Sequence, residues 1–406
     1  MSGVVVVGAG IAGVRAAESL RTSGYLGDIT LIGDEAPIYR PSISKEALTE
    51  GSQGTYPMPM KQGGPAFNWR LGSTVHQLDL SAQALTYQDS AGDFTQLEFD
   101  GLVVASGMRP RRLPVAGPEK GRYVLRTLAQ AQDLAHQLQP GTRLTIVGSG
   151  FIGCEVAAAA RARGCAVTVI SAASVPLASA VGVTIGQIVT QRHITEGVHF
   201  ALERSVREYR GDSAIREVVL DDGQVIGSDL VLEAVGSQPN VEWLEGQGLD
   251  TADGVLADGQ LRAVGTSAAV LMCGDLARHP NALFGSQARR VEHWTAAADT
   301  GAYAGRAMVR LLESGAIDLP DFAVVPSFWS DQYDLQIQSF GFPHLATEQQ
   351  VIELNADGSC IIECSDSQGL VAAIGINRTP ELARYRKSFS SRYESTGLLS
   401  EDAQPH

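Results

Sequence analysis

A glycine pattern occurs twice in this chain, each time between a short apolar run and a helix-like segment. The copies are VVVVGAGIAG over residues 4–13 and LTIVGSGFIG over residues 144–153. Their glycines are Gly8, Gly10 and Gly13 in the first copy and Gly148, Gly150 and Gly153 in the second. In each copy the first glycine allows a tight turn, the second lets the backbone approach a pyrophosphate, and the third lets helix and strand pack closely. Each copy therefore predicts a dinucleotide-binding unit with phosphates at the helix N-terminus.

The first copy is followed by an acidic residue at the expected distance. A helix-like stretch over Val14 to Ser23 is followed by a predicted strand over Asp28 to Ile32, which ends in Gly33, Asp34 and Glu35. A carboxylate about 20 residues after the glycines accepts a hydrogen bond from a ribose hydroxyl in such units. Strand, helix and acid thus all occur where dinucleotide binding requires them.

The second copy lacks that acid. A helix through Ala162 and a strand over Ala166 to Ile170 lead to Ser171, and residues 172–175 contain no arginine for a 2′-phosphate. A serine hydroxyl can bond to either cofactor form, so NADH and NADPH both remain open. Two glycine patterns imply two dinucleotides, and a flavin with a nicotinamide is the natural chemical pair. A duplicated domain with one empty site is the alternative.

Size and charge limit the possible functions. A chain of 406 residues predicts two or three domains. Its formal charge of −14 disfavours nucleic-acid binding, which depends on Lys and Arg. No apolar run approaches the roughly 18 residues of a membrane helix. Only Met1, Ser2 and Gly3 precede the first valines, which is too little for the basic leader of a secretory signal, so we expect a cytoplasmic protein.

The cysteines indicate neither a disulfide framework nor a metal site. The five are Cys154, Cys165, Cys273, Cys360 and Cys364, with no C-x-x-C spacing. Cys360 and Cys364 fall in one strand-like stretch and can face the same side. Without a second pair or a histidine partner, two ordinary strand cysteines are favoured over a metal site.

Further motifs between and after the glycine patterns follow the order of a known family. They are YRPSISK over residues 39–45, VVASG over 103–107, LRTL over 125–128, AVG over 234–236, CGD over 273–275 and FWSDQY over 328–333. With the two glycine patterns, the chain resembles the FAD-dependent ferredoxin reductases of bacterial oxygenase systems. The resemblance extends over nearly the whole chain, to about Arg386.

The resemblance implies an α/β fold with two Rossmann-like dinucleotide-binding domains, arranged as in glutathione reductase, and a C-terminal α+β domain. Residues 1–110 and 236–318 would form a discontinuous FAD domain. Residues 111–235 would form the NAD(P)-binding domain, and residues 319–406 a C-terminal domain of antiparallel strands. A helix over Thr295 to Ser314 would precede that last domain.

The resemblance also assigns residues to the site. Beyond the glycines, the predicted cofactor contacts are Ala12, Asp34, Glu35, Arg40, Lys45, Val75, Ala105, Gly107, Arg126, Phe151, Ile152, Glu155, Ser171, Gly236, Asp275, Glu292 and Trp294. Lys45 and Glu155 would pair beside the reactive flavin edge, where the lysine stabilises charge on the reduced flavin. Two unrelated surface charges are the alternative. Trp329 would meet the nicotinamide or the electron carrier, and a core tryptophan is an equally good interpretation.

The cysteines also bear on where the electrons go. None precedes Cys154, so the early FAD domain holds no redox pair, and the flavin would release its electrons directly. The resemblance implies a small [2Fe–2S] ferredoxin as acceptor. A basic docking face would be formed by Arg289 and Arg290 with Arg378, Arg384, Arg386 and Lys387. For any single one of these residues, a solvated surface side chain is the favoured interpretation. A rubredoxin reductase and an NADH-responsive flavoprotein redox sensor are the other functions considered, and the sequence leaves the oligomeric state open.

Overall fold

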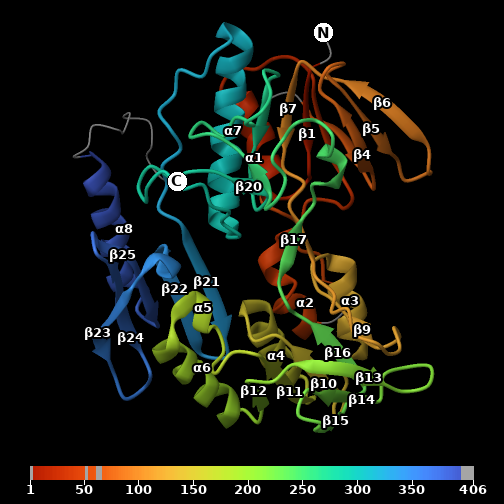
Figure 1. Cartoon of the computed structure of the whole chain (residues 1–406), viewed down its shortest axis with the longest axis vertical. Coiled ribbons are helices and arrows are strands. Elements are labelled where there is room, and N and C mark those ends of the chain that lie inside the picture. Colours follow the sequence, from red (N-terminus) through yellow and green to blue (C-terminus); the bar gives the residue numbers. More distant parts are fainter. Residues whose placement is uncertain (1–2, 51–53, 61–65, 395–406) are drawn as a thin grey trace.

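The fold consists of three sheet-based parts. The computed structural model describes residues 3–50, 54–60 and 66–394, with no account of the side chains after residue 389. A first parallel-sheet module lies at the top of Figure 1, a second lies at the bottom, and an antiparallel sheet flanks both on the left. The predicted fold, two Rossmann-like units with a C-terminal α+β part, is confirmed.

The first module has a parallel sheet in the order β19-β7-β1-β2-β3. The strands are β1 (Val4–Val7), β2 (Ile29–Gly33), β3 (Asn68–Leu71), β7 (Gly101–Val104) and β19 (Val270–Met272). β1 is the central strand and is buried on both faces, which explains its run of four valines. Because β19 comes from a late part of the chain, the sheet unites segments that are far apart in sequence.

Two helices pack against each other on this sheet, α1 (Ile11–Thr22) and α7 (Trp294–Ser314). Their approach depends on two glycines of α7. A Cβ on Gly301 would lie 2.2 Å from the Ala12 carbonyl oxygen, and one on Gly305 would lie 2.4 Å from the Ala16 oxygen. Small residues at this spacing therefore bring the backbones of the two helices into contact.

Smaller elements complete this module. An antiparallel sheet comprises β4 (Thr74–Asp79), β5 (Ala84–Gln88) and β6 (Phe94–Glu98). A second short pair comprises β18 (Val255–Leu256) and β20 (Ala277–Arg278), and η2 spans Glu242–Leu244. The segment with η1 (Arg40–Ser42) and α2 (Glu46–Thr49) leaves the module and packs on the second one, where Ile43 and Leu48 join the core.

The second module repeats the parallel design in the order β12-β11-β10-β16-β9. Its strands are β9 (Arg122–Tyr123), β10 (Arg143–Val147), β11 (Ala166–Ser171), β12 (His199–Leu202) and β16 (Leu230–Glu233). Its helices are α3 (Leu128–Gln137), α4 (Phe151–Ala162), α5 (Ala178–Val181) and α6 (Val183–Thr195). A three-stranded antiparallel sheet is formed by β13 (Val206–Arg210), β14 (Glu217–Leu220) and β15 (Val225–Gly227).

The chain enters and leaves the second module along one antiparallel pair. The strands are β8 (Met108–Pro110) and β17 (Ser237–Pro239), and Arg109 pairs with Gln238 at their centre. Two adjacent crossings therefore connect the modules.

The C-terminal part is an antiparallel sheet in the order β21-β22-β25-β24-β23, followed by a helix. The elements are β21 (Ser327–Gln332), β22 (Leu335–Gly341), η3 (Pro343–Leu345), β23 (Glu348–Leu354), β24 (Cys360–Asp366), β25 (Gly369–Ile376) and α8 (Thr379–Glu394). Residues of its inner face, such as Ile337 and Ile374, share a core with Ile185 and Val189 of α6. The sheet is thus fixed to the second module. Within the described ranges, no helix is both long and apolar enough to cross a membrane.

Candidate functional site

The two glycine turns have the same construction. The Gly8 amide donates to the Ile32 carbonyl at 2.7 Å, and the Gly148 amide donates to the Ile170 carbonyl at 2.8 Å. Both glycines have positive φ, 121° for Gly8 and 107° for Gly148. A Cβ would lie 2.0 Å from the Ala105 oxygen at Gly8 and 2.1 Å from the Ala234 oxygen at Gly148. Only glycine fits at either position.

The other glycines divide into packed and open positions. A Cβ on Gly13 would lie 1.8 Å from the Gly8 oxygen, and one on Gly153 would lie 2.1 Å from the Gly148 oxygen. By contrast, a Cβ on Gly10 or on Gly150 would meet no atom within 4 Å. Each turn is therefore open at its middle glycine, where we expect the protein backbone to contact a ligand.

The helices that follow begin immediately after those middle glycines. α1 begins at Ile11, earlier than the helix-like stretch from Val14 suggested, and α4 begins at Phe151. Neither helix has a capping side chain or an acidic residue in its first turn. Their first amides are thus available to an anion, and both turns fit a dinucleotide pyrophosphate.

The end of β2 carries two carboxylates with different partners. Glu35 accepts from Arg40 at 2.6 Å and from the Leu128 amide at 3.4 Å. Asp34 is exposed, and no residue in the described part of the chain donates a hydrogen bond to its carboxylate. Asp34 is therefore the carboxylate that remains available to a ribose hydroxyl, while Glu35 holds the loop with Arg40.

Two arginines and an aspartate surround this loop. Arg126 precedes Thr127, which caps α3 through a capping box with Gln130. Arg126 pairs with Asp275 at 3.0 Å, and its carbonyl oxygen accepts from Arg40. Burial, and secondly the charge of Arg126, lower the pKa of Arg40 from its usual value. A Cβ on Gly107 would lie 3.6 Å from the Arg126 guanidinium, so Gly107 belongs to the same cluster.

The end of β11 differs from the end of β2. The Ser171 hydroxyl lies 2.7 Å from the Ser149 hydroxyl and also accepts from the Ala173 amide at 3.1 Å. Its hydrogen bonds are therefore internal to the protein. Nearby, Phe151 packs on Phe328 with ring centroids 4.9 Å apart, whereas Ile152 stays 40% exposed at the start of α4.

Lys45 and Glu155 meet between the two modules. The lysine ammonium lies 3.1 Å from Glu155 Oε1, and Glu155 is only 6% exposed. Ser44 donates to Oε2 at 2.5 Å across 111 residues of sequence, and Ser330 donates to Oε1 at 2.7 Å. Sequence reasoning missed both serines as partners of Glu155. Their only signal was position, since each is adjacent to a predicted site residue, Lys45 or Trp329.

The other predicted residues lie in varied surroundings. The rings of Trp294 and Tyr39 meet edge to face, with their centroids 5.2 Å apart. Glu292 accepts a hydrogen bond from the Ser237 hydroxyl at 2.5 Å, next to Gly236. Ala12 and Val75 are buried in the core of the first module. Trp329 is half-buried on β21, on the face opposite to the buried Ser330.

The five cysteines are free and buried. Burial raises the pKa of every one of these thiols above its usual value. Cys360 and Cys364 lie in the apolar core between the C-terminal sheet and α6, together with Cys154. The structure thus places these thiols in packing positions.

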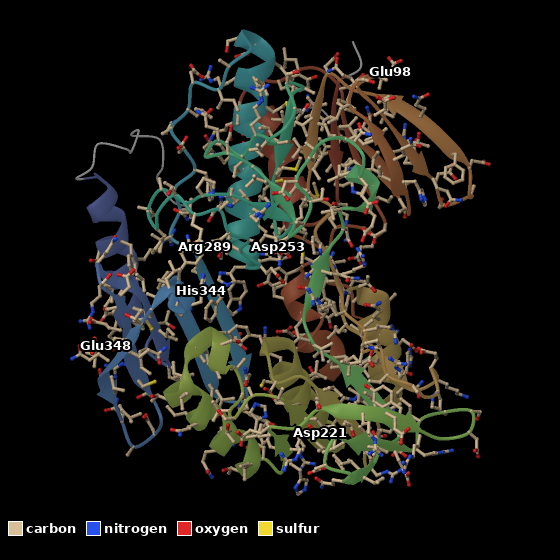
Figure 2. The ribbon with its side chains drawn as sticks, in the orientation of Figure 1. Glu98, Asp221, Asp253, Arg289, His344 and Glu348 are labelled. Carbon is tan, nitrogen blue, oxygen red and sulfur yellow. The ribbon has the colours of Figure 1, made fainter. Side chains whose placement is uncertain are left out.

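The predicted basic residues are in part neutralised. Arg290 pairs with Asp253 and with Glu292, each at 2.8 Å, and Arg378 pairs with Glu353 at 2.6 Å. Figure 2 labels Arg289 and Asp253 near the centre of the molecule, with His344 below them. Burial, and then the charge of Arg289, lower the pKa of His344.

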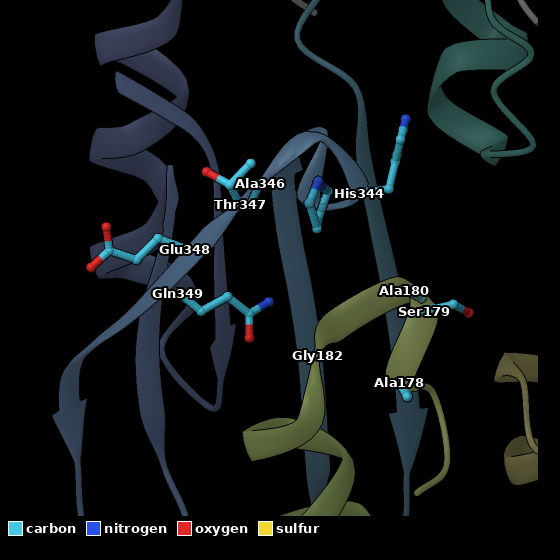
Figure 3. A pocket seen from close by; sticks show the side chains of 10 residues that line it. Ala178, Ser179, Ala180, Gly182, His344, Ala346, Thr347, Glu348 and Gln349 are labelled. Atoms are coloured by element: carbon cyan, nitrogen blue, oxygen red, sulfur yellow. The ribbon is translucent and has the colours of Figure 1, made fainter. Parts of the chain in front are cut away.

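A separate pocket of about 240 Å³ lies where α5 and the start of α6 meet η3 and the start of β23 (Figure 3). Gln349 points toward Gly182 there, and a Cβ on that glycine would lie 2.1 Å from Gln349 Oε1. None of the residues predicted to bind a cofactor lines this pocket.

Comparison with known proteins gives the same picture over the whole chain. Residues 2–301 match the family described as pyridine nucleotide-disulphide oxidoreductase, and residues 327–404 match the reductase C-terminal family. The ferredoxin–NAD(+) reductase component of the p-cumate 2,3-dioxygenase system of Pseudomonas putida is 31% identical over 400 residues, which cover 97% of this chain and 94% of that protein. The rubredoxin–NAD(+) reductase of Pseudomonas putida is 33% identical over 290 residues, covering 70% and 74%.

A solved structure is similar along almost the full length. It is the covalent complex of putidaredoxin reductase with putidaredoxin, with a TM-score of 0.85 and 26% identity. The match covers 96% of this chain and 93% of the solved chain.

Proposed function

The chain belongs to the pyridine nucleotide-disulphide oxidoreductase family, and from that membership we propose that it transfers electrons from NADH through FAD to a ferredoxin serving an oxygenase. The observation that carries the proposal is the pair of identically built glycine turns, each open at its middle glycine. Each turn suits its own pyrophosphate, so one chain accommodates a flavin and a nicotinamide dinucleotide together. Bound FAD would supply the chemistry of accepting a hydride and releasing the electrons one at a time.

The residues of the first module would hold FAD. The Gly8-Gly10-Gly13 turn offers the amides of α1 to the pyrophosphate, and Asp34 accepts from the ribose. Charged side chains lie at the adjacent loop, in the cluster of Arg40, Arg126 and Asp275. The remaining residues assigned from the family resemblance are proposed as contacts in the same sense.

The second module would hold the nicotinamide dinucleotide at the Gly148-Gly150-Gly153 turn. Ser171 provides no carboxylate, and its hydroxyl is bonded within the protein. NADH is the proposed donor because the relatives are named as NAD(+) reductases. NADPH is the form to compare with it, since no acid at this position opposes a 2′-phosphate.

Lys45 and Glu155 would act together at the boundary of the two modules. Because Glu155 accepts from Lys45 and from two serines, it holds the ammonium in one place. A fixed positive charge stabilises negative charge that develops during reduction. Trp329, half-buried on β21, is proposed to contact the nicotinamide or the carrier.

Direct release of electrons to a carrier has independent support in the thiols. All five cysteines are buried, and burial raises the pKa of each, so reactive thiolates are disfavoured. The proposed acceptor is a [2Fe–2S] ferredoxin, since a dioxygenase reductase component and putidaredoxin reductase are both similar over nearly the full chain. Free thiols also fit the reduced cytoplasm, the proposed location.

We further propose the domain limits expected from the sequence. The FAD domain would comprise residues 1–110 and 236–318, the NAD(P) domain residues 111–235, and the C-terminal domain residues 319–406. The β8–β17 pair supports these limits, since it contains both crossings between modules.

The test is anaerobic mixing of the purified flavoprotein with NADH or NADPH, followed by a ferredoxin coupled to cytochrome c. We expect rapid bleaching of the flavin and carrier-dependent reduction of the cytochrome. A purified protein that is colourless and does not bind added FAD would contradict the proposal. Reduction of cytochrome c at the full rate without any carrier would also contradict it. The rubredoxin reductase relative makes rubredoxin the second acceptor to include.

A further inference from the structure

Glu155 is the end of a row of buried polar side chains that extends away from Lys45. Ser330 donates to Glu155 at 2.7 Å, and Gln332 Nε2 donates to the Ser330 hydroxyl at 3.0 Å. His193 Nε2 lies 2.9 Å from Gln332 Oε1. Ser330, Gln332 and His193 are all fully buried. Burial of three polar side chains costs free energy of folding unless they form hydrogen bonds with one another or with a common partner.

The hydrogen bonds in this row can point in only one direction. An amide nitrogen donates only, so the Ser330 oxygen accepts from Gln332 and its own hydrogen goes to Glu155. An amide oxygen accepts only, so His193 carries its hydrogen on Nε2. No described residue makes a hydrogen bond with His193 Nδ1, and burial lowers the pKa of His193, in agreement with a neutral ring. Every donor in the row therefore points toward Glu155.

The row also joins the three parts of the molecule. His193 lies on α6 of the second module, Ser330 and Gln332 lie on β21 of the C-terminal sheet, and Glu155 lies on α4. Lys45 and Ser44 reach Glu155 from the first module. Side chains alternate along β21, so Ser330 and Gln332 face inward while Trp329 and Asp331 face the other way.

We propose that Ser330 is a positioning residue, oriented by Gln332 and His193, that keeps the Glu155 carboxylate directed at Lys45. This inference rests on the proposed role of the Lys45–Glu155 pair. A hydrogen bond from a fixed hydroxyl limits the orientations that a carboxylate can adopt, and the orientation of Glu155 is what holds the ammonium in place. Among described side chains, Lys45 is the one cation within ion-pair distance of Glu155, so the serine hydroxyls are its other main support.

The test is Ser330→Ala, with the limiting rate of flavin reduction at saturating NADH and the Kd for NADH measured separately by stopped-flow. Loss of one hydrogen bond to a charged group predicts a limiting rate that is slower by about tenfold. The Kd for NADH should stay unchanged, because Ser330 acts on the Lys45–Glu155 pair and not on the nucleotide. Gln332→Met removes the group that orients Ser330 while keeping side-chain volume, and it should lower the limiting rate by less.

Ser339→Ala is the matched control. Ser339 is a serine of the same sheet, 1% exposed, whose hydroxyl has no partner among the described residues. This variant should keep the wild-type limiting rate and the wild-type Kd for NADH. Retained FAD and the thermal midpoint establish that each variant is folded.

The outcomes separate this inference from the proposed function. If Ser330→Ala and Gln332→Met keep the wild-type limiting rate while Glu155→Gln lowers it, the positioning role is wrong and the Lys45–Glu155 role stands. If Glu155→Gln also leaves the rate unchanged, the pair itself has no part in the reaction. An equal loss of limiting rate in Ser330→Ala and in Ser339→Ala would overturn the positioning role by showing only a packing effect.

Discussion

The middle glycine of the second turn, Gly150, offers the sharpest test of nucleotide binding. Gly150 has φ −75° and ψ −174°, which alanine also adopts, and its added Cβ would meet no protein atom within 4 Å. Gly150→Ala should leave stability within about 0.5 kcal/mol of wild type, because the smaller conformational entropy of alanine in the unfolded chain offsets the preference of a helix N-cap for glycine over alanine. The methyl group instead occupies the space that a pyrophosphate needs.

The expected loss of affinity follows from the contacts that the methyl group prevents. A phosphate oxygen at a helix start accepts charge-assisted hydrogen bonds from backbone amides, each contributing about 1.5–3 kcal/mol. Loss of one such bond raises the Kd for NADH by about 10- to 100-fold. FAD should be retained, because its turn is in the other module.

Two further glycine variants serve as controls. Gly153→Ala places its Cβ 2.1 Å from the Gly148 oxygen, so it should lower stability by about 1–3 kcal/mol through overpacking. Gly10→Ala has the same open geometry as Gly150→Ala but lies in the first turn, so it should weaken FAD binding instead.

The assay is anaerobic stopped-flow, in which the dependence of flavin bleaching on NADH concentration gives the Kd. Bound FAD is measured from the visible spectrum, and stability from thermal unfolding. An unchanged NADH Kd in Gly150→Ala would refute the assignment of the second turn to the nicotinamide dinucleotide. Loss of FAD in that variant would also refute it, because the two turns would then not be independent.

Three other predictions concern charged side chains. Lys45→Met should slow flavin reduction by about a hundredfold with FAD retained, as expected when a charge-stabilising group is removed, and stopped-flow at saturating NADH measures it. Asp34→Asn should weaken FAD binding by about tenfold, measured by ultrafiltration, whereas Glu35→Gln should lower the thermal midpoint because it releases Arg40. Equal losses of FAD affinity in the two variants would contradict the different partners of Asp34 and Glu35. Burial raises the pKa of Asp299 to about 6, against the lowering charges of two arginines, so its ionised form destabilises the fold. The protein therefore loses about 3 kcal/mol of stability as the pH rises from 4 through 6, because the carboxyl group ionises in the unfolded chain before it ionises in the folded one. Asp299→Asn should add about 3 kcal/mol at pH 8 and nothing near pH 3.5 in denaturant titrations.

The two Rossmann-like units were predictable from the residues because their signals are local, whereas the C-terminal part was predicted from the family resemblance. In each glycine turn the strand, the turn and the helix occupy about 20 consecutive residues, so their spacing in sequence fixes their spacing in the structure. The helix beginning at Ile11, three residues before the predicted stretch, shows the limit of this reasoning. Helix periodicity does not reveal where the first free amide lies, and the turn geometry does.

The site was predictable only where a motif named its residues. Lys45 and Glu155 were proposed together from a family resemblance, and no local pattern links positions so far apart. The serines that complete their contacts escaped because a serine beside a motif residue has no distinctive spacing. The ion-pair partners of charged side chains could not be predicted from the sequence either, because the pairing of Arg290 with Asp253 depends on how two loops meet.

Ser330 and Trp329 are neighbours on β21, so one strand segment carries two residues of the proposed site. Neighbouring residues of a strand face opposite sides, so one short segment presents Trp329 to one side and holds Glu155 from the other. A shift of β21 would therefore move the aromatic ring and the support of the Lys45–Glu155 pair together. Because α6 fixes β21 through His193 and a shared apolar core, such a shift would have to disturb buried packing. The same packing that keeps the sheet on the second module thus keeps the charge of Lys45 in place.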